Sequence, residues 1–214
     1  MKISTFRKFL VGCVAVATVP LAFTAPAGAY DKASCTTSLK NVVGQFERAL
    51  RLIEGVSTVT GDPVDKATKL MQTELAAAKK YLSQVSSGQV LPILDQVCTA
   101  APAKARLGSL YVTAASIYLT AQAVEMQSST QLAVINSALA SRSVPRAKKA
   151  QYAYLLEYVN ATKGAAISVN AELDKLVPTA ATMSAEYVYY LEYFTVYLAA
   201  RSQASNQALI NINA

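Results

Sequence analysis

The stretch that decides the fold is Leu107-Gly-Ser-Leu-Tyr-Val-Thr-Ala-Ala-Ser-Ile-Tyr-Leu-Thr-Ala-Gln-Ala-Val124, which contains no charged residue. Drawn as a helix, it carries apolar side chains on every side, so it must be covered all round by protein or by lipid. Its hydroxyl and amide groups have no obvious partners in lipid, and its small residues let neighbouring helices approach closely. We therefore expect the rest of the chain to wrap it as the central rod of a soluble bundle, with insertion into a membrane as the alternative.

The segments before this rod have helical periodicity. The Thr36–Ser38 run is expected to cap a first helix that ends near Ile53, because its apolar residues recur at three- and four-residue spacing. Asp62-Pro63 is a strong start signal for a second helix, which should end before Ser86-Ser87-Gly88. Two helices of similar length joined by a short connection predict an antiparallel hairpin.

The central helix is expected to be interrupted. A short helical connector around Leu91 to Val97 precedes Pro102, which we expect to open the helix, and the pattern then continues to about Ser141. Such a helix would be about 60 Å long, roughly twice the first one. The polar run Gln127-Ser128-Ser129-Thr130 is the predicted place for a kink.

Two further helices complete the chain. Pro145 should start one and Pro178 should stop it, and the last runs from about Thr182 to Ile210. Tyr152 should face the core, and the predicted inward residues of the last helix are Met183, Tyr187, Tyr190, Leu191, Phe194, Tyr197 and Leu198. No segment alternates with period two, so no sheet is predicted. The predicted fold class is all-α, an antiparallel helical bundle of about five main helices.

The N-terminal 29 residues are predicted to be a signal peptide. A basic start with Lys2, Arg7 and Lys8 precedes an apolar core and the small-residue site Ala27-Gly28-Ala29. A lipobox at Leu10–Cys13 is the rival interpretation, disfavoured because the apolar segment before Cys13 is too short. Residues 30–214 should therefore form a single secreted or extracytoplasmic helical domain, with 17 basic against 13 acidic residues and a net charge of +4. This charge is far below what a nucleic-acid-binding protein needs.

Two cysteines, Cys35 and Cys98, follow the predicted signal peptide. In an exported protein an even pair is expected to be bridged. The antiparallel hairpin returns the chain to its starting point, so Cys98 should lie beside Cys35. A disulfide between them is predicted.

Tyrosine supplies the first candidate site. Eight of the 12 tyrosines lie between Tyr152 and Tyr197. Tyr154, Tyr158, Tyr189 and Tyr193 should lie on the flanks of the last two helices, where they could form a groove for a hydrophobic or aromatic ligand. The simpler interpretation is that tyrosine fills wide helix interfaces with its hydroxyl in water.

A basic run supplies the second candidate site: Arg142, Arg146, Lys148 and Lys149 fall within eight residues at a helix junction. They could bind an anionic surface, although a solvated turn explains the run alone and is the simpler interpretation. If the helices alternate up and down, further bases should lie near the same pole, namely Arg48, Arg51, Lys66, Lys69 and Arg201, whereas a reversal of the chain at Ser128 would separate them.

Catalysis finds little support in these residues. The chain has no histidine, which removes the commonest general base and a main zinc ligand. Its carboxylates do not form a catalytic pair in a shared pocket, and its glycines do not form a phosphate-binding loop. We expect a non-enzymatic binding or structural protein of a bacterial cell envelope or exterior, without cofactor or metal, whose partner is envelope polymer, anionic lipid or another surface protein. The alternatives are a membrane-active, pore-forming or lipid-binding protein and a carrier that uses the tyrosine groove.

Overall fold

The computed structural model describes residues 31–54, 62–89, 91–176 and 185–213, and every structural statement below concerns these residues. They contain no strand and form the helices α1 (Lys32–Glu54), α2 (Asp62–Ser86), α3 (Pro92–Ala140), α4 (Arg146–Leu176) and α5 (Ala185–Asn213). The predicted all-α bundle with its five helices is confirmed. The predicted signal peptide lies outside the described residues.

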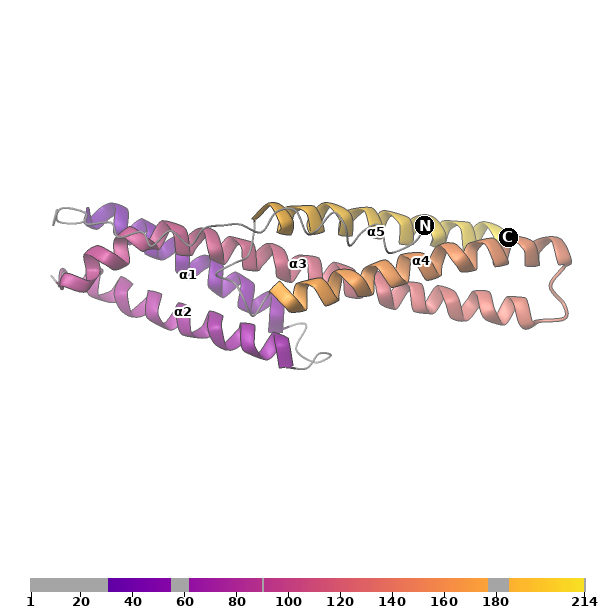
Figure 1. Ribbon diagram of the computed structural model, residues 1–214, viewed down its shortest axis with the longest axis horizontal. Helices are drawn as coiled ribbons and strands as arrows, with labels where there is room; N and C mark the ends of the chain where they lie inside the picture. Colours follow the sequence, from indigo (N-terminus) through magenta and orange to yellow (C-terminus); the bar gives the residue numbers. More distant parts are fainter. Residues whose placement is uncertain (1–30, 55–61, 90, 177–184, 214) are drawn as a thin grey trace.

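The molecule is elongated, and α3 runs along most of its length (Figure 1). The helices α1 and α2 lie beside the first half of α3, whereas α4 and α5 lie beside its second half. Among the described residues, α5 packs only on α3 and α4, and α2 packs mainly on α1. We call the end with the α2–α3 connection the proximal end and the turn between α3 and α4 the distal tip.

The first helix begins earlier than the sequence predicts. The carboxylate of Asp31 accepts hydrogen bonds from the backbone N–H groups of Ala33 and Ser34, at 3.2 and 3.0 Å, and so caps α1 at Lys32. The predicted cap at Thr36–Ser38 is wrong. The hydroxyls of Thr36 and Thr37 instead donate to carbonyls four residues earlier, as threonine does inside a helix.

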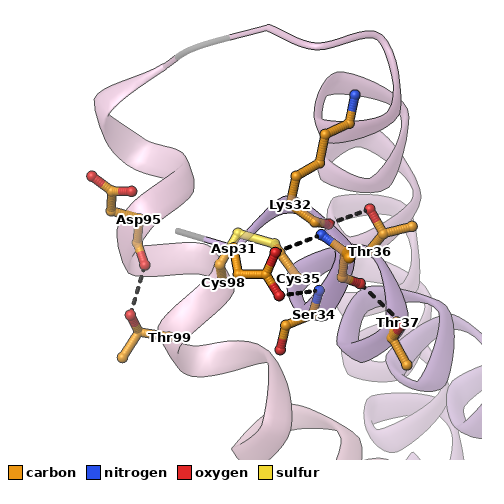
Figure 2. Close-up of a disulfide and its surroundings, with 10 residues drawn as sticks. Asp31, Lys32, Ser34, Cys35, Thr36, Thr37, Asp95, Cys98 and Thr99 are labelled. Carbon is orange, nitrogen blue, oxygen red and sulfur yellow. Dashed lines mark hydrogen bonds between the residues drawn. A yellow bond between two sulfur atoms is a disulfide. The ribbon is translucent and has the colours of Figure 1, made fainter. Parts of the chain in front are cut away.

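The disulfide Cys35–Cys98 joins α1 to the second turn of α3, with the two Cα atoms 5.0 Å apart (Figure 2). This prediction is confirmed, and so is the hairpin that brings the cysteines together. Lys79 on α2 pairs with Glu47 on α1 at 2.8 Å, and Gly88 turns the chain after α2 with a φ of 77°. The left-handed conformation explains why glycine occupies this position.

The third helix is continuous from Pro92 to Ala140, which corrects two predictions. Pro92, not Pro102, occupies the first turn, because Leu91 before it has the extended conformation that a residue preceding proline prefers. Pro102 lies inside α3. The first turns of α3 are set at an angle to the rest of the helix (Figure 1). Burial of Leu94 and Ala101 and the disulfide hold these turns in place despite the lost backbone hydrogen bond.

The charge-free rod is largely covered by its own chain. Tyr111, Ile117 and Val124 are buried, and the exposed residues of Leu107–Val124 are the small ones Ser109, Ser116 and Ala123. α3 is the one helix among the described residues that is long and apolar enough to cross a membrane, a test that the core helix of a soluble protein also passes. One face of the rod, at Ser109, Ser116 and Ala123, stays exposed, so the predicted wrapping holds only for its other sides.

The close packing of α1 on α3 depends on Gly108. A Cβ atom built on Gly108 would lie 2.8 Å from the Cβ of Gln45 and 3.4 Å from the ring of Phe46. Because the Cβ of Gln45 is fixed to the backbone, a side chain at position 108 would force the two helices apart.

We expect Gly108→Ala to lower the free energy of unfolding by about 1 to 2 kcal/mol, since overpacking outweighs a gain of about 1 kcal/mol in helix propensity. Gly164→Ala is the matched control. Gly164 lies inside α4 with no atom within 4 Å of its built Cβ, so the same change should stabilise the protein by about 1 kcal/mol. Urea denaturation followed by circular dichroism measures both, and two changes of equal sign would contradict the expectation.

A buried polar layer separates two apolar clusters along the rod. The larger cluster reaches Val124 on α3, Ala166 on α4 and Leu198 on α5, whereas the smaller one near the tip contains Ile135, Tyr152, Leu155, Val159 and Leu209. Between them on the three helices lie Ser128, Gln131, Thr162, Ser202 and Ser205, all nearly inaccessible to solvent. We call these five residues the polar layer.

Hydrogen bonds between α3 and α5 join three of the five residues of the polar layer, Gln131, Ser202 and Ser205. The amide of Gln131 donates to the carbonyl of Ser202 at 3.0 Å and accepts from the hydroxyl of Ser205 at 2.8 Å. The hydroxyl of Ser202 donates to the side-chain oxygen of Gln127 at 2.8 Å. Gln127, the first residue of the polar run at 127–130, therefore bonds to α5, and α3 continues through the predicted kink.

Candidate functional site

The distal tip concentrates positive charge. Arg142 and Arg146 are exposed, and Lys148 and Lys149 are half-buried on the first turn of α4. No residue between Glu125 and Glu157 is acidic, nor is any residue of α5 after Glu192. None of the four tip bases forms an ion pair with another described residue. The tip is therefore an unneutralised cationic surface at the extremity of a long rod (Figure 1).

The tip does not include Arg48 and Arg51 of α1, which were expected at the same pole. The contact of Gly108 with Phe46 places the C-terminal half of α1 beside the first half of α3. Arg51 therefore lies roughly 40 Å from Arg142 along the helix axis. The predicted shared pole is wrong, because α3 extends well past the end of α1.

The structure does not gather the four predicted tyrosines into one groove. Tyr158 faces α5, where the guanidinium of Arg201 lies 4.1 Å from its ring centre. Tyr154, Tyr189 and Tyr193 are 76%, 56% and 78% exposed. Because α4 and α5 are antiparallel, Tyr154 and Tyr193 lie roughly 20 Å apart along the bundle. A ligand role for these tyrosines stays a prediction.

An aromatic row runs along one side of α5 instead. The rings of Tyr187, Tyr190, Phe194 and Tyr197 follow one another with centres 6.3 to 6.4 Å apart. Tyr190 and Tyr197 are about half exposed, so their predicted inward orientation is wrong, whereas that of Leu191, Leu198 and Tyr152 is confirmed. The guanidinium of Arg201, 5.8 Å from the ring centre of Tyr197, ends the row as a cation–π partner.

A cleft of about 200 Å³ lies between α1, α2 and α3 near the proximal end. Its lining is mostly apolar, and Lys104 on α3 pairs with Glu74 on α2 at 2.6 Å within it. Sequence reasoning missed this cleft, because it arises from the sparse contact between α2 and α3, which periodicity does not indicate.

Two tyrosine hydroxyls have altered acidity. Burial, with a smaller contribution from Glu74, raises the pKa of Tyr111 to about 12, and its hydroxyl has no hydrogen-bond partner among the described residues. Burial also raises the pKa of Tyr187 to about 12, reinforced by Glu172, whose carboxylate accepts a hydrogen bond from the Tyr187 hydroxyl at 3.3 Å. Both hydroxyls are therefore harder to ionise than an ordinary tyrosine.

In the described part of the chain no three His, Cys, Asp or Glu side chains cluster closely enough to hold a metal ion. Comparison with known proteins finds no matching family model, no similar curated protein and no similar solved structure. The candidate functional surfaces must therefore be judged on their own chemistry. The distal tip is the one surface at which the residues of a predicted site lie close together.

Proposed function

We propose that the protein is an exported, non-enzymatic rod that binds anionic, phosphate-bearing material of the cell envelope through its distal tip. The observation that carries the proposal is the separation of charge along the molecule. Four bases at the tip have no acidic neighbour in sequence and no ion-pair partner among the described residues. Clusters of this kind attract anionic surfaces by about 1 kcal/mol per base.

Two further features support the proposal. The Cys35–Cys98 disulfide fits an oxidising compartment outside the cytoplasm, as does the predicted signal peptide. The first turn of α4 contains no acidic residue, and its basic residues stand at the positive end of the helix dipole. Such a placement costs stability, which is consistent with the bases serving an external anion rather than the fold.

The test is co-sedimentation with vesicles of phosphatidylglycerol and phosphatidylcholine at low ionic strength. Arg142→Ser with Arg146→Ser should weaken binding about 30-fold, the equivalent of about 2 kcal/mol for two bases. Arg48→Ser with Arg106→Ser removes the same charge from exposed positions away from the tip and should change binding little.

The outcomes separate the candidate functions. The proposal is supported if binding depends on the tip bases and is lost with vesicles of pure phosphatidylcholine. The vesicles should also keep their contents enclosed. Release of an enclosed dye would favour the membrane-active alternative, in which α3 leaves its covering helices and enters the bilayer. Equal weakening by both pairs of substitutions, or no binding at low ionic strength, would overturn the role of the tip.

A further inference from the structure

The last helix has two rows of regularly spaced residues on nearly opposite faces, and within the described part of the chain only one of them is covered. The inward seam repeats at alternating three- and four-residue steps and is buried throughout, at Val188, Leu191, Thr195, Leu198, Ser202, Ser205 and Leu209. The outward seam has the same spacing and is exposed throughout, at Tyr189, Tyr193, Val196, Ala200, Gln203, Gln207 and Ile210. We call the second set the outer seam.

The spacing of the outer seam is that of a coiled-coil contact. Alternating steps of three and four keep a stripe on one side of a helix, where a second helix can pack along it. The stripe extends over about 32 Å from Tyr189 to Ile210. Tyr189, Tyr193, Val196 and Ile210 are exposed by 56%, 78%, 62% and 53%, and a row of such side chains on one helix face is the kind of surface that marks an interaction site.

No other part of the described chain covers the outer seam, because α5 contacts only α3 and α4. We propose that the outer seam is the interface of a homodimer, in which α5 of one copy packs antiparallel on α5 of the other. The inference goes beyond the proposed function, because it concerns a different surface and holds whatever the tip binds.

Two properties of the outer seam suit it to pack against the outer seam of a second copy of this chain. Ala200 lies near the middle of the seam, where a small residue lets two helices approach closely about a two-fold axis. The aromatic half, with Tyr189 and Tyr193, would then pack against the half with Gln203 and Gln207. The long glutamine side chains can cover the rings and bond to their hydroxyls.

The positions of the glutamates on α5 favour antiparallel over parallel pairing of the two α5 helices. Glu186 and Glu192 are exposed and flank the aromatic half of the seam, whereas the glutamine half is flanked by uncharged residues such as Asn206 and Asn211. A parallel pair would place each glutamate beside its own copy, which like-charge repulsion disfavours. The antiparallel pair instead places each glutamate beside amides.

Sedimentation equilibrium of the disulfide-bonded protein tests the interface. We expect a monomer–dimer equilibrium with a micromolar dissociation constant, which Tyr193→Glu with Val196→Glu weakens at least 100-fold without loss of helical circular dichroism. Tyr154→Glu is the control, because Tyr154 is equally exposed but lies on α4. A monomer at every concentration, or a dimer that the outer-seam variant leaves intact, overturns the proposal.

Single cysteines test the direction of pairing. Ala200→Cys near the middle of the seam should form an intermolecular disulfide with its own copy, whereas Tyr189→Cys at the end should not. Cross-linking of Tyr189→Cys to itself would mean parallel pairing and overturn the antiparallel arrangement. Because vesicle binding is measured separately with the Arg142 and Arg146 variants, failure of the dimer leaves the proposed function of the tip unaffected, and the reverse also holds.

Discussion

Replacing Cys35 and Cys98 together by alanine is expected to lower the free energy of unfolding by about 4 kcal/mol, the largest single effect that we anticipate. The bond closes a loop between residues 63 positions apart, so it removes many conformations from the unfolded chain. It also fixes the first turns of α3, where Pro102 has interrupted the backbone hydrogen bonds. Alanine is preferred to serine because Cys35 is buried and a serine hydroxyl there would add a separate cost.

Urea denaturation with and without a thiol reductant measures the effect. The reduced wild-type protein and the alanine pair should unfold at similar urea concentrations, both well below the oxidised protein. Ser34→Ala with Thr99→Ala is a matched pair at exposed neighbouring positions and should alter stability by less than about 1 kcal/mol. A loss of under about 1 kcal/mol in the cysteine variant would contradict the expectation.

Replacing Gln131 by alanine is expected to cost about 3 kcal/mol, because it removes two buried hydrogen bonds and leaves a cavity between α3 and α5. The carbonyl of Ser202 loses a donor that water cannot easily replace in so buried a position. Gln151→Ala, at an exposed position of α4, makes the same chemical change and should stay within about 0.5 kcal/mol of the wild type.

A double-mutant cycle between Gln131→Ala and Ser205→Ala separates the hydrogen bond from the cavity. If the polar layer acts as one network, the two changes should be non-additive by at least about 1 kcal/mol. Strict additivity, with a loss at Gln131 no greater than at Gln151, would show that the layer does not stabilise the contact between α3 and α5.

Periodicity and start signals predicted most of the architecture. Asp62-Pro63 and Pro145 mark the starts of α2 and α4 to within a residue, because proline restricts the chain locally whatever packs around it. The disulfide followed from the return path of a hairpin. These features depend on neighbouring residues or on chain length, both of which can be read directly from a sequence.

The errors arose where long-range packing overrides local preference. Pro102 looked like a helix start, yet the disulfide and buried neighbours keep it inside α3. The polar run at 127–130 looked like a kink, yet Gln127 accepts a hydrogen bond from Ser202 of α5 and α3 continues through the run. The bases expected at one pole are separated because α3 extends well beyond the end of α1. The predicted kink implied a shorter straight helix than the structure has.

The candidate surfaces were predicted only in part. The four bases of the tip remain neighbours because they lie in one short turn, so their clustering needs no tertiary information. The four tyrosines were assigned to one groove from helical angles alone, which cannot tell how far apart two positions lie along a bundle. Counting three- and four-residue steps on both sides of α5 would have revealed the outer seam.

The uninterrupted course of α3 fixes the distance between the disulfide and the distal tip. From Cys98 to Ala140 the helix rises about 63 Å, and the bonds of the polar layer prevent α5 from sliding along it by a turn. A group attached near the disulfide is therefore held at a constant distance from Arg142 and Arg146. Inserting or deleting seven residues in α3 would change that distance by about 10 Å.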